Sequence, residues 1–194
     1  MNLQRRSEPF LESEGHMEQS RDENAAKENA ARNLKKSEIE SEERALNRAL
    51  TEVNKNHGAT FAGGNIGIWG LVNSDPGFTY PHLIDTLIEH FLLPYSVQTK
   101  EAIARALTCK EAKNTDAPDH YMRELKSLHS PMCYPDSSFR FAIINALNHI
   151  GDNRQVEGIK NLIEDERYAD EREFLEKTLL KIQKRKYKHN RAVP

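Results

Sequence analysis

The sequence lacks several features that would point to a simple class of protein. No apolar run approaches the roughly 20 residues that cross a bilayer, and the N-terminal residues lead into acids instead of an apolar signal core. Only two cysteines occur among 194 residues, which excludes a disulfide framework. The net charge of -2 removes the basic surplus typical of nucleic-acid-binding proteins. We therefore expect a cytoplasmic protein with reduced cysteines.

Aromatic residues are scarce in the N-terminal third. They make up 7% of the chain, and 13 of the 14 lie at Phe61 or later. Residues 16–57 contain no glycine or proline and are rich in alanine and charge, which favours helix but buries little. Only residues 46–53 carry apolar side chains at helical spacing. The sequence thus predicts a charged arm over residues 1–57, partly disordered, with a helix near 40–55.

Glycine is concentrated in one segment. Six of the nine glycines lie within residues 58–77. A loop that cradles phosphate would use glycines in this way, but no strand pattern precedes the segment and no Gly-Lys-Ser/Thr sequence ends it. We therefore predict that residues 58–78 form a glycine-rich connection with a short helix around 66–72, and that Trp69 packs in the core.

Strand patterns are absent, and short helical patterns follow one another from Pro81 onward. Proline, glycine and capping aspartates separate them. The predicted helices are 81–92, one that starts near 96, 119–129, 138–150, 154–165 and 171–186. The chain is therefore predicted to be all-α, with helical repeats over residues 79–183 and a basic tail over 184–194.

Two of these helices repeat each other. Residues 102–107, AIARAL, align with residues 142–147, AIINAL, at an offset of 40, and Leu175, Thr178 and Leu179 continue the pattern at a further 32. A single helix pair cannot bury its apolar face alone, so repeated pairs must stack. The pattern predicts a short α-solenoid of about three stacked antiparallel helix pairs, with an N-terminal helical or partly disordered arm.

The repeated segment also carries a resemblance. Residues 139–152, FRFAIINALNHIGD, resemble the second helix and exit turn of a HEAT repeat. Residues 69–73, 87–95 and 101–112 are similar to a group of uncharacterised bacterial proteins with HEAT-repeat domains. This resemblance implies a right-handed helical solenoid without a known activity.

The residue chemistry does not favour catalysis or a bound metal. No two of the eight histidines converge with carboxylates or thiolates at ligand spacing. Cys109 is predicted at a helix C-terminus, where the helix dipole disfavours a thiolate, and Cys133 is in a turn without a group that would activate it. We predict no catalytic residue, no metal site and no cofactor.

The repeat alignment predicts a protein-binding strip on the second helices, opposite their apolar stripe. Charged and amide groups surround one aromatic ring there, and aromatic residues and arginine are enriched at interfaces. The alternative that Phe141 is covered by its neighbours stays open. The strip comprises Gln98, Glu101, Arg105, Phe141, Asn145, Glu173 and Lys177.

Charge is distributed unevenly along the chain. Residues 61–180 carry 12 basic and 18 acidic side chains, whereas residues 181–194 carry six basic ones and no acid. An acidic body argues against a HEAT-like DNA-repair enzyme, which needs a basic groove. The leading hypothesis is a non-enzymatic scaffold, adaptor or immunity-like module that binds another protein. The alternative is a nucleic-acid-associated protein that uses the tail residues Lys181, Lys184, Arg185, Lys186, Lys188 and Arg191.

Overall fold

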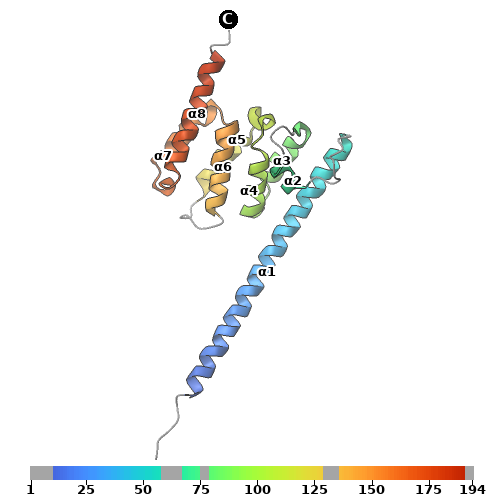
Figure 1. The fold of residues 1–194 in the computed structure, drawn as a ribbon, viewed down its shortest axis with the longest axis vertical. Coiled ribbons are helices and arrows are strands. Elements are labelled where there is room, and N and C mark those ends of the chain that lie inside the picture. Colours follow the sequence, from blue (N-terminus) through green and yellow to red (C-terminus); the bar gives the residue numbers. More distant parts are fainter. Residues whose placement is uncertain (1–10, 58–66, 75–78, 129–135, 191–194) are drawn as a thin grey trace, which may run out of the picture. The chain divides into compact units, whose positions relative to one another are not determined.

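The described part of the protein is helical throughout. The computed structural model describes residues 11–57, 67–74, 79–128 and 136–190, with side chains for 24–57, 67–74, 79–128 and 137–185. Over these residues no strand occurs, and no helix is both long and apolar enough to span a membrane. The α-helices are α1 (Leu11–Asn56), α2 (Ile68–Val72), α3 (Ile84–Phe91), α4 (Val97–Ala106), α5 (Ala117–Ser127), α6 (Asp136–Ile150), α7 (Val156–Glu164) and α8 (Arg172–Asn190) (Figure 1).

Four short 3-10 segments complete the described structure. They are η1 (Pro81–Leu83), η2 (Lys110–Asn114), η3 (Asn153–Gln155) and η4 (Glu166–Tyr168). η1 runs directly into α3, η3 runs directly into α7, and the other two lie in the connections before α5 and α8. The predicted all-α class is therefore confirmed for the described residues.

The chain divides into two units, Met1–Glu40 and Ser41–Pro194, and α1 contributes residues to both. In the first unit, the described side chains from residue 24 onward are exposed, apart from the half-buried Ile39. A helix that is polar on every side gains no stability from burial. Its stability therefore depends on the intrinsic preference of alanine and charged residues for helix.

Helix α1 is longer than the segment 40–55 that the sequence predicts to be helical, because it begins at Leu11. Two ion pairs with helical i,i+4 spacing lie in the added part, Arg32 with Glu28 at 3.6 Å and Lys36 with Glu40 at 4.0 Å. Such pairs each stabilise an isolated helix by about 0.2–0.5 kcal/mol. Alanine residues and ion pairs thus stabilise this part of α1, which has no apolar face to bury.

In the second unit, the C-terminal part of α1 packs at one end of the helical stack. Leu46 and Leu50 are fully buried. The Glu42 carboxylate accepts hydrogen bonds from the backbone N–H of Ser96, at 2.9 Å, and from the Thr99 hydroxyl, at 2.7 Å. It thereby satisfies the Ser96 N–H, one of the backbone donors at the start of α4 that have no partner within the helix.

The helices after α2 pack in sequential pairs. α3 lies against α4, α5 against α6, and α7 against α8. α4, α6 and α8 also pack side by side, and α2 packs on α4 (Figure 1). The predicted helix 119–129 begins two residues earlier, at Ala117, because Pro118 occupies its first turn, where a missing N–H costs nothing.

The repeated apolar stripe forms the interior between these pairs. Ile103 on α4 and Leu107 directly after it, Ile143 and Leu147 on α6, and Leu175 on α8 are all fully buried. The repeated pattern therefore has the same role on α4, α6 and α8, since on each helix its apolar side chains are buried between neighbouring helix pairs.

The prediction that Trp69 packs in the core is wrong. Its side chain is 48% exposed, whereas Ile68 and Leu71 are buried. A helix of only five residues can turn one narrow face inward, and these two aliphatic side chains occupy it. The Trp69 indole Nε1–H instead donates a hydrogen bond to Glu43 Oε1 at 3.1 Å.

Candidate functional site

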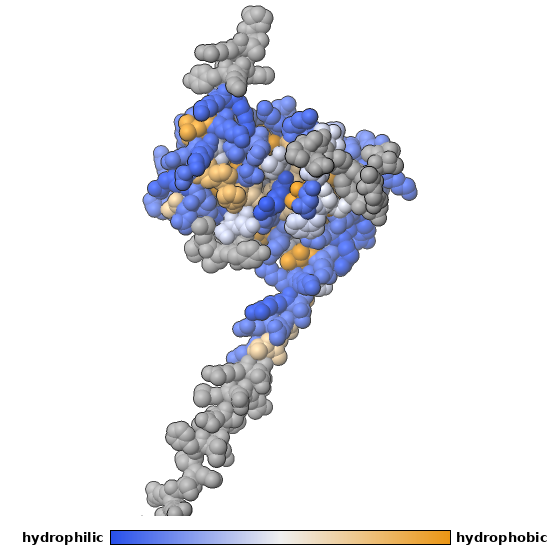
Figure 2. Space-filling model, in the orientation of Figure 1, coloured by the Kyte–Doolittle hydropathy of each residue, from blue (hydrophilic) through white to orange (hydrophobic). Residues whose placement is uncertain are grey.

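The exposed side of the α4–α6–α8 row carries the predicted protein-binding strip. The Ser138 hydroxyl on α6 donates a hydrogen bond to Glu101 Oε1 on α4 at 2.8 Å, which links the two helices at this surface. Figure 2 shows hydrophobic side chains over α6 and α8, surrounded by hydrophilic ones. The row therefore presents a mixed surface in which an apolar patch is framed by charge.

An aromatic pair forms the apolar centre of the strip. Phe141 on α6 is 54% exposed. Its ring stacks on that of Phe174 on α8, with ring centroids 4.7 Å apart and an interplanar angle of 12°. Phe174 is half-buried and packs against the core. Phe141 is thus held in place from one side while its remaining surface faces solvent.

Two ion pairs within single helices flank the aromatic pair. On α4, Arg105 Nη2 lies 2.7 Å from Glu101 Oε1, and on α8, Lys177 Nζ lies 2.6 Å from Glu173 Oε1. The hydrogen bond from Lys177 lowers the pKa of Glu173 below its usual value. Lys177 and Glu173 are both exposed, and exposed pairs of this kind contribute little to stability. In the other pair Arg105 is exposed, whereas Glu101 keeps only 16% of its side-chain surface and also binds Ser138. The charges of Arg105, Lys177 and Glu173 are therefore available to a partner at small cost.

The other two strip residues are half-buried. Gln98 lies in the first turn of α4, and Asn145 lies one turn beyond Phe141 on α6. The backbone oxygen of Asn145 is hydrogen bonded to His149 Nδ1 at 2.8 Å. Gln98 on α4 and Asn145 on α6 therefore belong to the same row of helices as the aromatic pair.

The predicted basic tail is helical as far as Asn190. Lys181 and Lys184 are exposed on α8. Arg185 is instead an internal contact, since its guanidinium donates hydrogen bonds to the backbone oxygens of Gly151, at 2.9 Å, and Asn148. Burial lowers the pKa of Arg185. The side chains of Lys186 and Lys188, and all of Arg191, lie outside the described residues.

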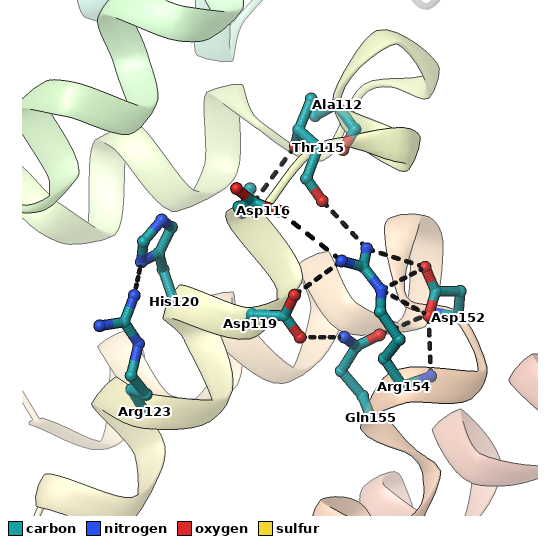
Figure 3. Close-up of polar contacts among 10 residues, drawn as sticks. Ala112, Thr115, Asp116, Asp119, His120, Arg123, Asp152, Arg154 and Gln155 are labelled. Atoms are coloured by element: carbon teal, nitrogen blue, oxygen red, sulfur yellow. Dashed lines mark hydrogen bonds and ion pairs between the residues drawn. The ribbon is translucent and has the colours of Figure 1, made fainter.

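A polar network centred on Arg154 was not predicted from the sequence (Figure 3). From the connection before α7, the Arg154 guanidinium reaches Asp119 Oδ2 at 2.8 Å and the backbone oxygen of Thr115 at 3.1 Å. It also binds the Asp152 carboxylate at 3.0 Å. Burial raises the pKa of Asp152, but hydrogen bonds from Arg154 outweigh this and hold it below its usual value.

Arg167 makes a similar arrangement one connection later. Its guanidinium binds the Asp165 carboxylate at 2.6 Å and reaches the backbone oxygen of Leu128 at 3.5 Å. The separation from Arg167 to Leu128 is 39 residues, the same as from Arg154 to Thr115. The two arginines therefore tie both ends of the α7 segment to the two ends of α5.

The signal for these two contacts is the sequence Asp-x-Arg, which occurs three times; two copies, Asp152–Arg154 and Asp165–Arg167, make them, whereas Arg172 of the third contacts the backbone oxygen of Ile163. In both copies the aspartate caps a 3-10 segment and pairs with the arginine two residues later. We call them the Asp-x-Arg clamps. Their sequence is too short to indicate, without the structure, which carbonyl each arginine reaches.

Two observations on the described residues concern metal binding and cysteine chemistry. They contain no group of three or more His, Cys, Asp or Glu side chains arranged to hold a metal ion. Cys109 is half-buried, and burial raises the pKa of its thiol, which disfavours the nucleophilic thiolate. Cys133 lies outside the described residues.

Comparison with known proteins yields no relative from which to transfer a function. The chain matches no protein-family model, no curated protein and no solved structure. The function of this chain, helical throughout its described residues, is therefore argued from its own surface.

Proposed function

We propose that this protein is a non-enzymatic module that binds another protein through the strip on α4, α6 and α8. The observation that carries the proposal is the half-exposed Phe141, stacked on Phe174 and flanked by two surface ion pairs. Interfaces place aromatic anchors at their centre and polar groups at their rim. The strip has this arrangement on one continuous row of helices.

A HEAT-like solenoid is the architecture that we propose for the second unit. Three features support it: the sequential helix pairs, the buried stripe repeated on α4, α6 and α8, and the equal 39-residue separation of the two clamps. In repeat proteins, such aligned helices form extended binding surfaces. The fold-level analogy by itself does not identify the partner.

The partner that suits the strip is a protein segment with an apolar or aromatic side chain between polar groups. Its apolar group would cover the exposed part of Phe141, and its carboxylate or amide groups would meet Arg105 and Lys177. Since neither cation is fully buried, these charges would favour correct orientation more than tight binding.

Site-specific crosslinking tests the proposal. A photoreactive phenylalanine analogue replaces Phe141 in the full chain, and the matched control carries it at Leu92, which is also 54% exposed but lies between α3 and α4. We expect one partner to be crosslinked from position 141 and not from position 92. Crosslinking of the same proteins from both positions would contradict the proposal.

The affinity of variants for the purified partner then measures how much Phe141 contributes to binding. Phe141→Ala is expected to weaken binding by about 30-fold, because a central aromatic anchor contributes about 2 kcal/mol or more. Arg105→Glu is expected to weaken it less, and Leu92→Ala not at all. If Phe141→Ala binds the partner with unchanged affinity and has an unchanged melting temperature, the strip is not the surface that binds the partner.

A further inference from the structure

A second surface lies on the C-terminal part of α1 and is basic. Arg44, Arg48, Thr51 and Lys55 follow one another at i, i+4, i+7 and i+11, so they share one face of the helix. They line a hollow of about 1110 Å³ whose other lining residues are Asn47, Glu52, Asn56 and Gly67. We call this surface the α1 basic face.

The cations of this face are accessible. Arg44, Arg48 and Lys55 are all exposed. Within the described part of the chain, neither Arg48 nor Lys55 forms an ion pair, and the one contact of the Arg48 guanidinium is with the backbone oxygen of Arg44, at 3.3 Å. Glu52 is the single acid among the lining residues. At a rise of 1.5 Å per residue, the three cations extend over about 16 Å.

The acidic character of residues 61–180 does not cancel this local charge. Charges in solvent are screened beyond about 8 Å at physiological ionic strength. A polyanion that lies along α1 therefore responds chiefly to Arg44, Arg48 and Lys55, and to the opposing charges on Glu52 and, beside Trp69, on Glu43.

The exposed Trp69 stands beside this face. Asn47, which lines the hollow, accepts a hydrogen bond from the backbone N–H of Ile68 at 2.7 Å. The next residue, Trp69, donates its indole N–H to Glu43, one turn before Asn47 on α1. The indole is thereby fixed two residues beyond Gly67, which lines the hollow, while 48% of the residue stays exposed.

A basic groove combined with an exposed aromatic ring is typical of proteins that bind single-stranded nucleic acid. Proteins that bind single strands use cations to follow the phosphates and aromatic rings on which bases stack. An acidic protein segment would use the cations but would not need a flat aromatic platform.

We infer that the α1 basic face binds single-stranded nucleic acid, with phosphates along Arg44, Arg48 and Lys55 and a base stacked on Trp69. This site is separate from the strip on α4, α6 and α8 and from the predicted basic tail. The strip can fail the crosslinking test at Phe141 without affecting this inference.

The single tryptophan of the chain makes a direct test possible. The full chain is titrated with an oligothymidylate of about 12 nucleotides, a length within the roughly 4–16 nucleotides that one such surface binds. We expect the fluorescence of Trp69 to be quenched on stacking. With three phosphate contacts on a single strand, the logarithm of the binding constant should fall against the logarithm of salt with a slope of about -2.

Substitutions then locate the site, with binding measured by the anisotropy of a labelled oligothymidylate. The double variant Arg48→Glu and Lys55→Glu is expected to lose at least tenfold in affinity. Trp69→Ala is expected to lose roughly tenfold, the equivalent of one stacked base. The matched control, Lys113→Glu with Lys126→Glu at two other exposed lysines, makes the same change of net charge and should leave the affinity nearly unchanged. Circular dichroism checks that each variant keeps its helical content.

Three results would overturn the inference. One is oligothymidylate binding that does not change the fluorescence of Trp69, or no binding at all. Another is an equal loss of affinity in the α1 charge variant and in the control charge variant, which would indicate attraction by charge alone. The third is displacement of the oligothymidylate by polyglutamate of similar length at equal concentration, which would identify the face as a surface for acidic proteins.

Discussion

Gly151 directly follows α6, where the chain turns toward α7. It lies close to Ile182 on α8. Its backbone N–H donates a hydrogen bond to the Leu147 oxygen at 2.8 Å. A Cβ at this position would lie 2.5 Å from that same oxygen and 2.8 Å from Ile182 Cδ1. Since a helix carbonyl cannot move aside without breaking its own contacts, glycine is required here for space.

Gly151→Ala is therefore expected to destabilise the protein by about 1–3 kcal/mol, the usual cost of overpacking. The matched control is Gly158→Ala in α7, where the new Cβ would meet the flexible end of Met122, at 2.7 Å from Cε. That variant should be neutral or stabilised by up to about 1 kcal/mol, because alanine favours helix over glycine. Urea unfolding of both variants measures the difference, and equal effects would show that Gly151 has no steric role.

At the scale of elements, the Asp-x-Arg clamps show how neighbouring helix pairs are kept in register. Arg154 ties η3 to the start of α5, and Arg167 ties η4 to the end of α5. The backbone oxygen of Arg167 also accepts a hydrogen bond from the buried Arg140 on α6, at 3.0 Å. α7 is therefore held at both ends, while its apolar side chains Ile159 and Leu162 are buried.

Removal of Arg154 should cost more than removal of an ordinary surface cation. Arg154→Gln leaves Asp119 and Asp152 without their shared cation, so we expect a loss of about 1–2 kcal/mol, within the usual range for a broken network. The control Lys160→Gln removes one exposed pair with Glu157 and should cost less than about 0.5 kcal/mol. Chemical denaturation compares the two variants, and equal losses would mean that the clamp is only a surface contact.

At the scale of the whole molecule, three histidines share one direction of pKa shift. Burial lowers the pKa of His82, with a further contribution from His57, whose ring centroid is 5.0 Å away. Burial also lowers the pKa of His90 and, together with the charge of Arg123, that of His120. In each case the folded protein favours the neutral imidazole, whereas the unfolded chain protonates near pH 6.5.

The stability of the protein should therefore fall with pH below about 6.5. Above the unfolded pKa the histidine contribution is fully present, and it is lost as the pH falls through that value toward the lower folded pKa. Glu171 opposes this trend, because burial raises its pKa despite the nearby Arg140, so its contribution is lost as the pH rises above its usual range. Urea midpoints from about pH 7.5 to about pH 5.5 test the prediction, and His82→Gln should flatten the dependence. A midpoint that rises on acidification would contradict it.

Local physics explains why the sequence predicted the helices so well. The stripe that contains Ile103, Ile143 and Leu175 follows from spacing alone, since apolar side chains at helical intervals must be buried together. The same logic placed the start of α4 near Ser96, whose side chain accepts a hydrogen bond from the Thr99 N–H. Helix length was less predictable, because α1 continues through residues whose preference for helix is not visible as an apolar pattern.

The tertiary structure alone decided which side chains are available to a partner. Phe141 and Phe174 are 33 residues apart, and only the packing of α6 on α8 brings their rings together. Trp69 became a surface residue because Ile68 and Leu71 fill the single inward face of α2, and Arg185 became an internal contact because carbonyls of the α6 end lie within its reach. Class and core are set by short-range periodicity, which a sequence records directly. Exposure and pairing depend on residues from different helices meeting in space, so they became known only once the helices were packed.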